Sequence, residues 1–295
     1  NFEFGFQGPG TNGFTQNGSG YVYTASSLVD LSYSDYQAYG ATLLDKVTSA
    51  INGQIAPLHV HAVPASALAT LASDTHVGGI TVIDSASAIA GQLTQIESAN
   101  LAGRLSAVTI NSGELDLHPS DLSTLISHNV AIGSANGGTV ALVVDNSAQL
   151  ADLANVGSAN QSFAQLGISA VHLQAGAQYA ISAQNLDTII GKAGALWSGV
   201  NNTFNIADTA LNLQNHWSVL ESLNATGQLG TVTANSGNIT LPAGIGAADI
   251  AVLNHFASPI NSITVGQAGL LREGFIREGA FGDDLSWFNS PYHAP

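Results

Sequence analysis

The feature that most constrains this chain is an internal repeat. Asp84, Asp145 and Asp208 recur at an interval of about 62 residues. Each aspartate ends an apolar run and precedes small polar residues and an aliphatic stretch: GITVIDSASAI at 79–89, VALVVDNSAQL at 140–150 and TFNIADTALNL at 203–213. Repetition on this scale indicates an array whose units pack against their neighbours.

A second block repeats in the same phase. Val108, Val171 and Val232 recur at the same interval, and each is followed by a turn signal, NSG, QAG or NSG. The pattern predicts strand, helix, two short strands across a turn, and helix in every unit. We expect an α/β fold, a solenoid-like array of about three 62-residue units with parallel strands and helices along a flank.

The composition of the chain divides it into a repeat region and two unlike ends. The expected parts are an N-terminal Gly/aromatic extension at 1–23, a degenerate capping unit at 24–75, repeats at 76–136, 137–199 and 200–266, and a C-terminal aromatic tail at 267–295.

The repeated aspartates have a structural explanation. Asp84, Asp145 and Asp208 each stand between a predicted strand and a predicted helix. A carboxylate at such a position accepts hydrogen bonds from the free amide groups of the first helical turn. We therefore interpret these three residues as helix caps rather than ligand-binding residues.

The charge of the chain excludes several classes of function. It has 5 Lys+Arg against 20 Asp+Glu, and its net charge is −15. So few basic residues cannot neutralise a run of phosphates, which argues against nucleic acid and anionic lipid as partners. No apolar stretch approaches the roughly 20 residues of a membrane span. The chain has no Cys, so disulfides, thiolate catalysis and Cys-based zinc sites are excluded.

The repeat resembles a known group of sequences. The pattern of strand, D-[ST]-A and aliphatic helix, followed by S-x-[VI]-T, a turn, a strand and a helix, is similar to the DTAANI-type repeats of large secreted and surface proteins of bacteria. The likeness covers roughly residues 65–265. It implies an extracellular or cell-surface protein with a structural or matrix role, and it brings no catalytic signature with it.

Aromatic residues gather at the two ends of the chain. The first 23 and the last 21 residues hold eleven of the twenty aromatics: Phe2, Phe4, Phe6, Phe14, Tyr21, Tyr23, Phe275, Phe281, Trp287, Phe288 and Tyr292. Two interpretations are open. These segments could fold back and cover the end strands of their own chain. Alternatively, they could dock on a neighbouring copy, and a head-to-tail contact that does not close produces a filament. We favour this assembly because few charges leave little repulsion between copies.

Metal and cofactor sites have little support in the sequence. His59 and His61 lie two apart, so they share a face of a strand and are candidate metal ligands. Asp283 and Asp284 are the local candidates for calcium. An exposed histidine pair and a solvated acidic turn explain these residues more simply, so we expect no cofactor, with calcium as the alternative.

Three functions follow in order of preference. The first is a non-enzymatic extracellular protein that assembles with copies of itself into a filament, surface layer or matrix. The second is a monomeric adhesin that binds surface polysaccharide. The third is a polysaccharide-active enzyme, and it comes last because the sequence has no GxSxG elbow, P-loop or HExxH motif.

Overall fold

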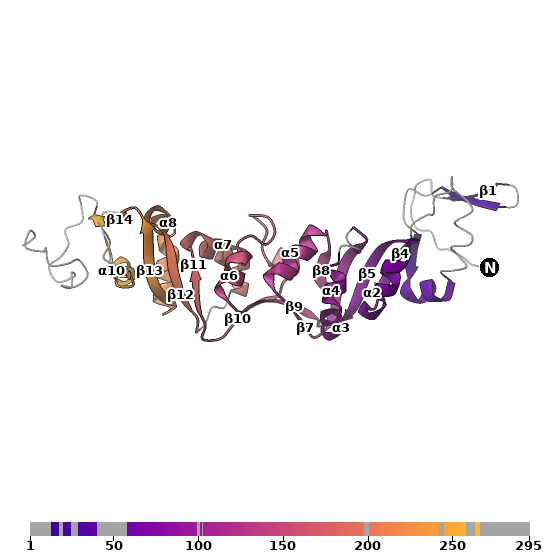
Figure 1. Cartoon of the computed structure of the whole chain (residues 1–295), viewed down its shortest axis with the longest axis horizontal. Coiled ribbons are helices and arrows are strands. Elements are labelled where there is room, and N and C mark those ends of the chain that lie inside the picture. The colour runs from indigo at the N-terminus through magenta and orange to yellow at the C-terminus, as the bar shows by residue number, and fades with distance from the viewer. Residues whose placement is uncertain are drawn as a thin grey trace, which may run out of the picture. The chain divides into compact units, whose positions relative to one another are not determined.

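The computed structural model describes residues 13–17, 20–24, 29–39, 58–98, 101, 103–197, 201–241, 245–257 and 263–265. In these ranges the protein is a mixed α/β fold with parallel sheets (Figure 1). Contacts divide the chain into a first unit, formed by Asn1–Asp116, Asp121–Val140 and Leu166–Ile168, and a second unit, formed by the remaining residues.

The first unit contains a five-stranded sheet whose strand order is β3-β4-β5-β6-β8. Every pair in it is parallel. The strands are β3 (Val29–Ser32), β4 (Leu58–Val63), β5 (Val77–Ser85), β6 (Leu105–Ser112) and β8 (Ala131–Ser134), and β7 (Glu114–Leu117) follows β6 after a turn.

Helices lie between the strands of the first unit, because parallel strands need a crossover connection. They are a short helix over residues 33–39, η1 (Ala65–Ala67), α2 (Leu68–Ser73), α3 (Ala86–Ala90), α4 (Leu93–Ile96) and α5 (Pro119–Ser127). A separate antiparallel hairpin is formed by β1 (Gly13–Asn17) and β2 (Gly20–Thr24).

The second unit contains the sheets β11-β12-β13 and β14-β15, and it contributes β10 and most of β9 to a sheet with the order β10-β9-β7. Its strands are β9 (Thr139–Val144), β10 (Ala170–Leu173), β11 (Gln178–Ile181), β12 (Thr203–Thr209), β13 (Leu229–Ser236), β14 (Ile239–Leu241) and β15 (Ile263–Val265). Its helices are α6 (Ser147–Leu153), η3 (Ala164–Leu166), α7 (Ala183–Ala193), η4 (Gly194–Leu196), α8 (Ala210–Asn215), α9 (Trp217–Ala225) and α10 (Ala247–Leu253).

Alternating burial explains why these segments form strands. In β12 the side chains of Phe204 and Ile206 are buried, whereas Asn205 and Ala207 are not. The same period of two gives β4 its buried Leu58 and Val60. One face of each strand thus packs into the core. Each fully buried aliphatic or aromatic side chain stabilises the fold by roughly 1.5–3 kcal/mol.

The order of elements follows the expected pattern. The ranges 76–136, 137–199 and 200–266 each contain strand, helix, strand, strand and helix in that order. The glycines of the three turn signals, Gly113, Gly176 and Gly237, all have positive φ, as a tight turn between two strands requires. The strand expected at SITVG is β15.

Strand pairing has a shorter step than the sequence repeat. Thr81 of β5 pairs with Ala107 of β6, and both strands lie in the range 76–136. Phe204 of β12 pairs with Leu229 of β13 within the range 200–266. The two longer strands of one such range therefore pair with each other, across α3 and α4 in the first case and across α8 and α9 in the second.

Candidate functional site

The aromatic residues expected to mediate assembly lie mostly outside the described residues. This holds for Phe2, Phe4, Phe6, Phe275, Phe281, Trp287, Phe288 and Tyr292, and also for the calcium candidates Asp283 and Asp284. Phe14, Tyr21 and Tyr23 lie in the β1–β2 hairpin. Its backbone register places Phe14 opposite Tyr23 and Gln16 opposite Tyr21.

Two of the three repeated aspartates join consecutive helices. The Oδ1 atom of Asp84 accepts a hydrogen bond from the backbone N–H of Ser85 at 2.8 Å, and its Oδ2 accepts one from the N–H of Ala65 at 2.9 Å. In the second unit, Asp208 accepts from the N–H of Thr209 at 2.8 Å and from the N–H of Gln184 at 3.4 Å. Each carboxylate therefore holds the chain next to it and the first turn of the preceding helix.

The expectation that these aspartates are the N-caps of the helices that follow them is wrong by one residue. The N-caps are Ser85, Asn146 and Thr209, each of which accepts a hydrogen bond from a backbone N–H in the first turn. The position after the aspartate has extended backbone, as an N-cap requires. Asp84 and Asp208 bond instead to the N–H of the next residue and backwards to Ala65 and Gln184, and Asp208 also accepts from Nδ2 of Asn212 at 2.8 Å.

Asp145 differs from the other two. Its Oδ2 lies 3.7 Å from Nδ1 of His118, and its backbone N–H donates to Oε1 of Gln149 at 2.7 Å. The preceding helix, α5, begins at Pro119, which has no N–H to donate. The first residue of α5 therefore cannot donate to Asp145 in the way that Ala65, the first residue of η1, donates to Asp84.

The ends of two helices are held by basic side chains. The guanidinium of Arg104 donates to the carbonyls of Leu71, Ala72, Asp74 and Val77 at 2.8–2.9 Å, at the end of α2. The ammonium of Lys192 donates to the carbonyls of Ala154 and Val156, both at 2.9 Å, at the end of α6. Such donors satisfy carbonyls that have no partner within a helix.

These two side chains are the basic residues among those the structure describes. Lys192 is only 5% exposed, and its burial lowers the pKa of the ammonium group. Because both cations are occupied by backbone carbonyls, neither is available to bind an anionic ligand.

A polar cluster lies beside Arg104. Tyr36 Oη donates to Asp74 Oδ2 at 2.5 Å, and the backbone N–H of His76 donates to Asp74 Oδ1 at 2.9 Å. Burial acts to raise the pKa of Asp74, but these hydrogen bonds from Tyr36 and His76 outweigh it and lower the pKa. Burial and the adjacent carboxylate raise the pKa of Tyr36 to about 12. Tyr36 is therefore a hydrogen-bond donor to a charged carboxylate.

The histidines pair with aspartates that the sequence does not indicate. His59 Nδ1 lies 2.5 Å from Oδ1 of Asp30, its direct register partner in β3, and His216 Nδ1 lies 2.7 Å from Oδ2 of Asp187. His59 and His61 share β4, as predicted. Within the described part of the chain, no three metal-ligating side chains come together. Asp30 and His59 are distant in the sequence, so only the strand pairing reveals their contact.

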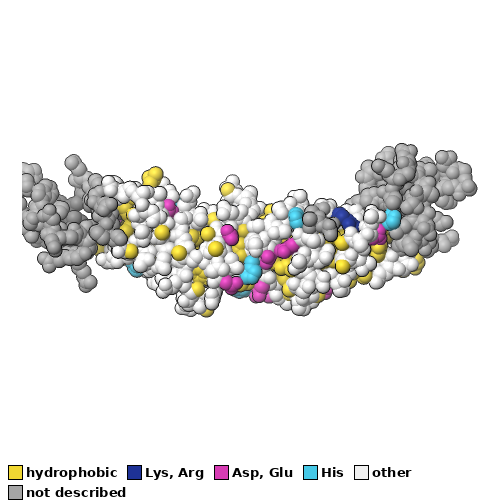
Figure 2. Space-filling model, in the orientation of Figure 1, with side chains coloured by type: hydrophobic (Ala, Val, Ile, Leu, Met, Phe, Trp, Pro, Cys, Tyr) yellow, Lys and Arg dark blue, Asp and Glu magenta, His cyan; other side chains and the backbone are white. Residues whose placement is uncertain are grey.

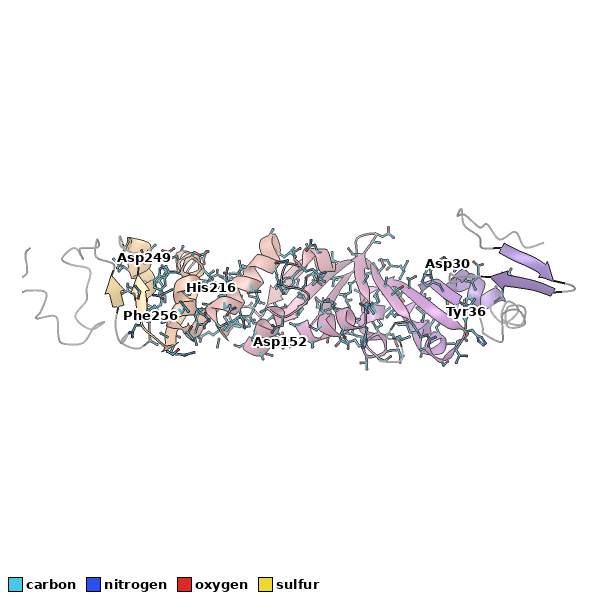
Figure 3. The ribbon with its side chains drawn as sticks, turned by 90° about the horizontal axis from the view of Figure 1, so that it is seen from above. Asp30, Tyr36, Asp152, His216, Asp249 and Phe256 are labelled. Carbon is cyan, nitrogen blue, oxygen red and sulfur yellow. The ribbon has the colours of Figure 1, made fainter. Side chains whose placement is uncertain are left out.

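At the end of the second unit, aromatic and acidic side chains meet. Trp217 donates its indole N–H to Asp249 Oδ1 at 2.8 Å, and its ring stacks on Phe256 with centroids 6.3 Å apart. Asp249 and Phe256 are labelled in Figure 3. These contacts fix α9 against α10 and the segment after it.

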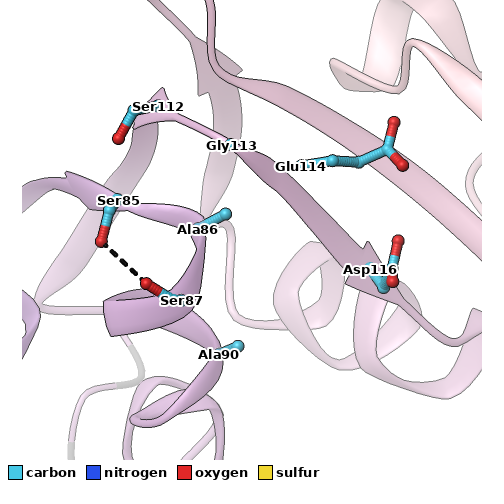
Figure 4. A pocket seen from close by; sticks show the side chains of 8 residues that line it. All are labelled: Ser85, Ala86, Ser87, Ala90, Ser112, Gly113, Glu114 and Asp116. Carbon is cyan, nitrogen blue, oxygen red and sulfur yellow. Dashed lines mark hydrogen bonds between the residues drawn. The ribbon is translucent and has the colours of Figure 1, made fainter.

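A hollow of about 370 Å³ lies between α3 and β7 in the first unit (Figure 4). It is lined by Ala86 and Ala90 of α3, by Ser85, Ser87, Ser112 and Gly113, and by the carboxylates of Glu114 and Asp116. Sequence reasoning missed this site. The only signal is that α3 has alanine at two helix positions, whereas each of the other two repeats has a polar residue at one of them.

Comparison with models of protein families, with curated proteins and with solved structures finds no match. Among the described helices, none has the length and apolar character needed to cross a membrane.

Proposed function

We propose that this chain is an extracellular structural protein of bacterial type that assembles head to tail with copies of itself into a filament, surface layer or matrix. Its repeats form a solenoid-like array, and its aromatic segments, 1–23 and 275–295, make the contacts between copies. The proposed role is not enzymatic and needs no cofactor. Nucleic acid and the membrane interior are not among the proposed partners.

The observation that carries the proposal is the parallel pairing of strands across helical crossover connections. Ile80 pairs with Leu105, Ala107 with Ala131, and Gln178 with Thr203. Each step advances the chain by roughly 25 residues, which is within the range of one repeat in a solenoid. The sequence repeat of about 62 residues is longer than two such steps, and an array of this kind has no inherent limit on its length.

The ends of a parallel stack favour assembly. Among the described strands, the five-stranded sheet ends in β3, which pairs only with β4, and in β8, which pairs only with β6. A terminal strand offers backbone N–H and C=O groups to a further strand unless something covers it. Because the two ends of a parallel stack are different, contact between them is head to tail, and a contact of this kind yields an open polymer.

The surface composition also favours close approach of copies. On the face shown in Figure 2, atoms of uncharged polar side chains and of the backbone predominate, with small areas of hydrophobic side chains and few charged groups. The chain as a whole has only 8% charged residues. Few charges leave little repulsion between copies at short range, although the net charge of −15 makes association dependent on salt.

The test is the size of the purified particles. We expect the full chain to form filaments or sheets in negative-stain electron microscopy, and sedimentation velocity to show growth with concentration. Replacing Phe2, Phe4 and Phe6 by Ser should leave a folded monomer. Leu211→Ser is the matched control, because Leu211 is 65% exposed and belongs to the second unit rather than to an aromatic segment.

Two results would contradict the proposal. One is a full chain that remains a monodisperse monomer at high concentration across a range of salt. The other is unchanged assembly after both aromatic segments have been replaced, which would assign them to the covering of their own chain's end strands.

A further inference from the structure

The three helices that follow the repeated aspartates start in the same way but meet the next strand differently. In α6 the first residue is Ser147, two positions after Asp145. Its Oγ accepts a hydrogen bond from the backbone N–H of Ala180, the third residue of β11, at 2.8 Å. The hydroxyl of Ser147 thus bonds α6 to the edge of the strand.

In α8 another position makes the equivalent contact. Gln214, six positions after Asp208, donates from Nε2 to the backbone carbonyl of Thr240 at 2.6 Å. Thr240 is the middle residue of β14. In the second unit a polar side chain of the helix therefore bonds to the strand, as the acceptor from Ala180 in one case and as the donor to Thr240 in the other.

In α3 both helix positions are alanine. Ala86 takes the place of Ser147, two positions after the repeated aspartate, and Ala90 takes the place of Gln214, six positions after it. Neither alanine side chain has an atom that can form a hydrogen bond. The helix therefore gives the neighbouring strand no polar side chain at either position.

Asp116 of β7 lines the hollow together with these two alanines. It lies between Leu115 and Leu117, and both leucines are buried. Ala180 has the same place in β11, between the buried Tyr179 and Ile181. In the first unit a hollow therefore lies beside this position of the strand, where in the second unit Ser147 bonds to it.

The lining of this hollow defines the chemistry of a ligand. The equivalent strand positions bond to an acceptor in one case and to a donor in the other, and a hydroxyl group is both. Ser85, Ser87 and Ser112 offer further hydroxyls, while Glu114 and Asp116 offer carboxylate acceptors. Neither a basic nor an aromatic side chain lines it, so it suits neither an anion nor a large flat ring.

We propose that the hollow between α3 and β7 is a binding site for one residue of a neutral sugar. The sugar hydroxyls replace the side-chain groups that Ser147 and Gln214 supply elsewhere, and the carboxylates of Glu114 and Asp116 accept from further hydroxyls. The volume of about 370 Å³ is at the lower end of the range of small-molecule sites. This function goes beyond assembly and does not depend on it.

The experiment titrates the full chain with glucose, galactose, mannose and N-acetylglucosamine and follows backbone amide shifts by NMR. We expect at least one sugar to bind with millimolar affinity and to shift the amide signals of the residues at 85–90 and 112–116. Glucose 6-phosphate and glucuronate should bind at least tenfold more weakly than the neutral sugars, because the site has two carboxylates and no cation.

Matched variants exchange the alanine of α3 and the glutamine of α8 at the position six residues after the repeated aspartate. Ala90→Gln places in α3 the side chain that α8 has, and it should weaken sugar binding at least tenfold. Gln214→Ala should open a second hollow beside β14, so that sugar causes shifts around residues 210–214 and 238–240 as well. Circular dichroism of both variants establishes that they are folded.

Three outcomes would overturn the inference. The first is the absence of any shift at 85–90 and 112–116 with all four sugars at 100 mM, roughly a hundredfold above millimolar affinity. The second is sugar binding that Ala90→Gln leaves unchanged. The third is a change in particle size caused by Ala90→Gln when no sugar has any effect. The last result would assign the hollow to a side chain of a neighbouring copy.

Discussion

In both units of the molecule a basic side chain donates to the carbonyls at the end of a helix, but the residue that does so differs. In the first unit, the guanidinium of Arg104 donates to four carbonyls at the end of α2. In the second unit, the ammonium of Lys192 donates to two carbonyls at the end of α6. The comparison teaches that a basic side chain can satisfy helix-end carbonyls from different positions of the repeat, so the sequence repeat alone cannot identify it.

The largest effect should come from Arg104. We expect Arg104→Ala to lower the free energy of unfolding by about 4 kcal/mol, because four carbonyls lose a charged donor. Lys192→Ala should cost less, about 2 kcal/mol, since two bonds are lost and the burial of a charge is relieved. Urea unfolding followed by far-ultraviolet circular dichroism measures both values.

Controls for this comparison come from conservative variants. Arg104→Lys should recover part of the loss, whereas Lys192→Met keeps the aliphatic stem and isolates the contribution of the donor. Tryptophan fluorescence follows the second unit alone, because Trp197, Trp217 and Trp287 all belong to it. Equal losses below about 1 kcal/mol for both alanine variants would mean that solvent replaces these donors.

A smaller difference should separate the repeated aspartates. Asp208 is 7% exposed and accepts three hydrogen bonds, so Asp208→Ala should cost about 2–3 kcal/mol. Asp84→Ala should cost about 1–2 kcal/mol, and Asp145→Ala less than about 0.5 kcal/mol, because exposed ion pairs with histidine contribute little. An Asp145 variant as unstable as the Asp208 variant would contradict the backward contact as the source of the difference.

The N-caps should contribute alike in both units. Ser85→Ala, Asn146→Ala and Thr209→Ala each remove the acceptor of one first-turn N–H and should each cost about 1 kcal/mol. Ser87→Ala is the control, since Ser87 is exposed in the same helix as Ala86 and caps nothing. Thermal unfolding of the four variants measures the effect, and a loss at Ser87 equal to that at Ser85 would refute the assignment.

The smallest effects should appear in the dependence of stability on pH. Burial and the charge of Asp121 raise the pKa of Glu97, so its folded form favours the proton, and stability is lost as the pH rises above the unfolded pKa of about 4.3. Glu97→Gln should therefore raise Tm at pH 7 and leave it nearly unchanged at pH 3.5. The hydrogen bonds to Asp74 lower its pKa against the effect of burial, so its contribution is present above the unfolded pKa of about 3.9 and is lost as the pH falls.

Asp74→Asn should accordingly lower Tm at pH 7, and the difference from the parent chain should narrow toward pH 3. Scanning calorimetry between pH 3 and pH 8 measures both variants. If Glu97→Gln and Asp74→Asn both raise Tm at pH 7, or both lower it, then the fold does not shift the pKa values of these two carboxyls in opposite directions.

The sequence was sufficient for the order of elements, because strands and helices leave periodic patterns and the turn glycines recur. It was insufficient for the pairing of strands. The repeat predicts that successive copies stack on one another, whereas β5 pairs with β6, and β12 with β13, within one copy. Expecting Asp84 to cap the following helix was wrong for a local reason: Ser85 is as good a cap and stands one position closer. The contact between Asp30 and His59 depends on tertiary register alone.

The placement of Arg104 and Lys192 has a consequence for the resistance of the chain to proteolysis. Across the described residues from 58 to 257, these two are the cleavage positions that a protease of trypsin-like specificity recognises. One is held by four carbonyls and the other is buried within a helix, so the enzyme cannot seat either side chain in its specificity pocket. Trypsin can therefore cleave this stretch only after it unfolds, and resistance to trypsin measures how stable the contacts of Arg104 and Lys192 are.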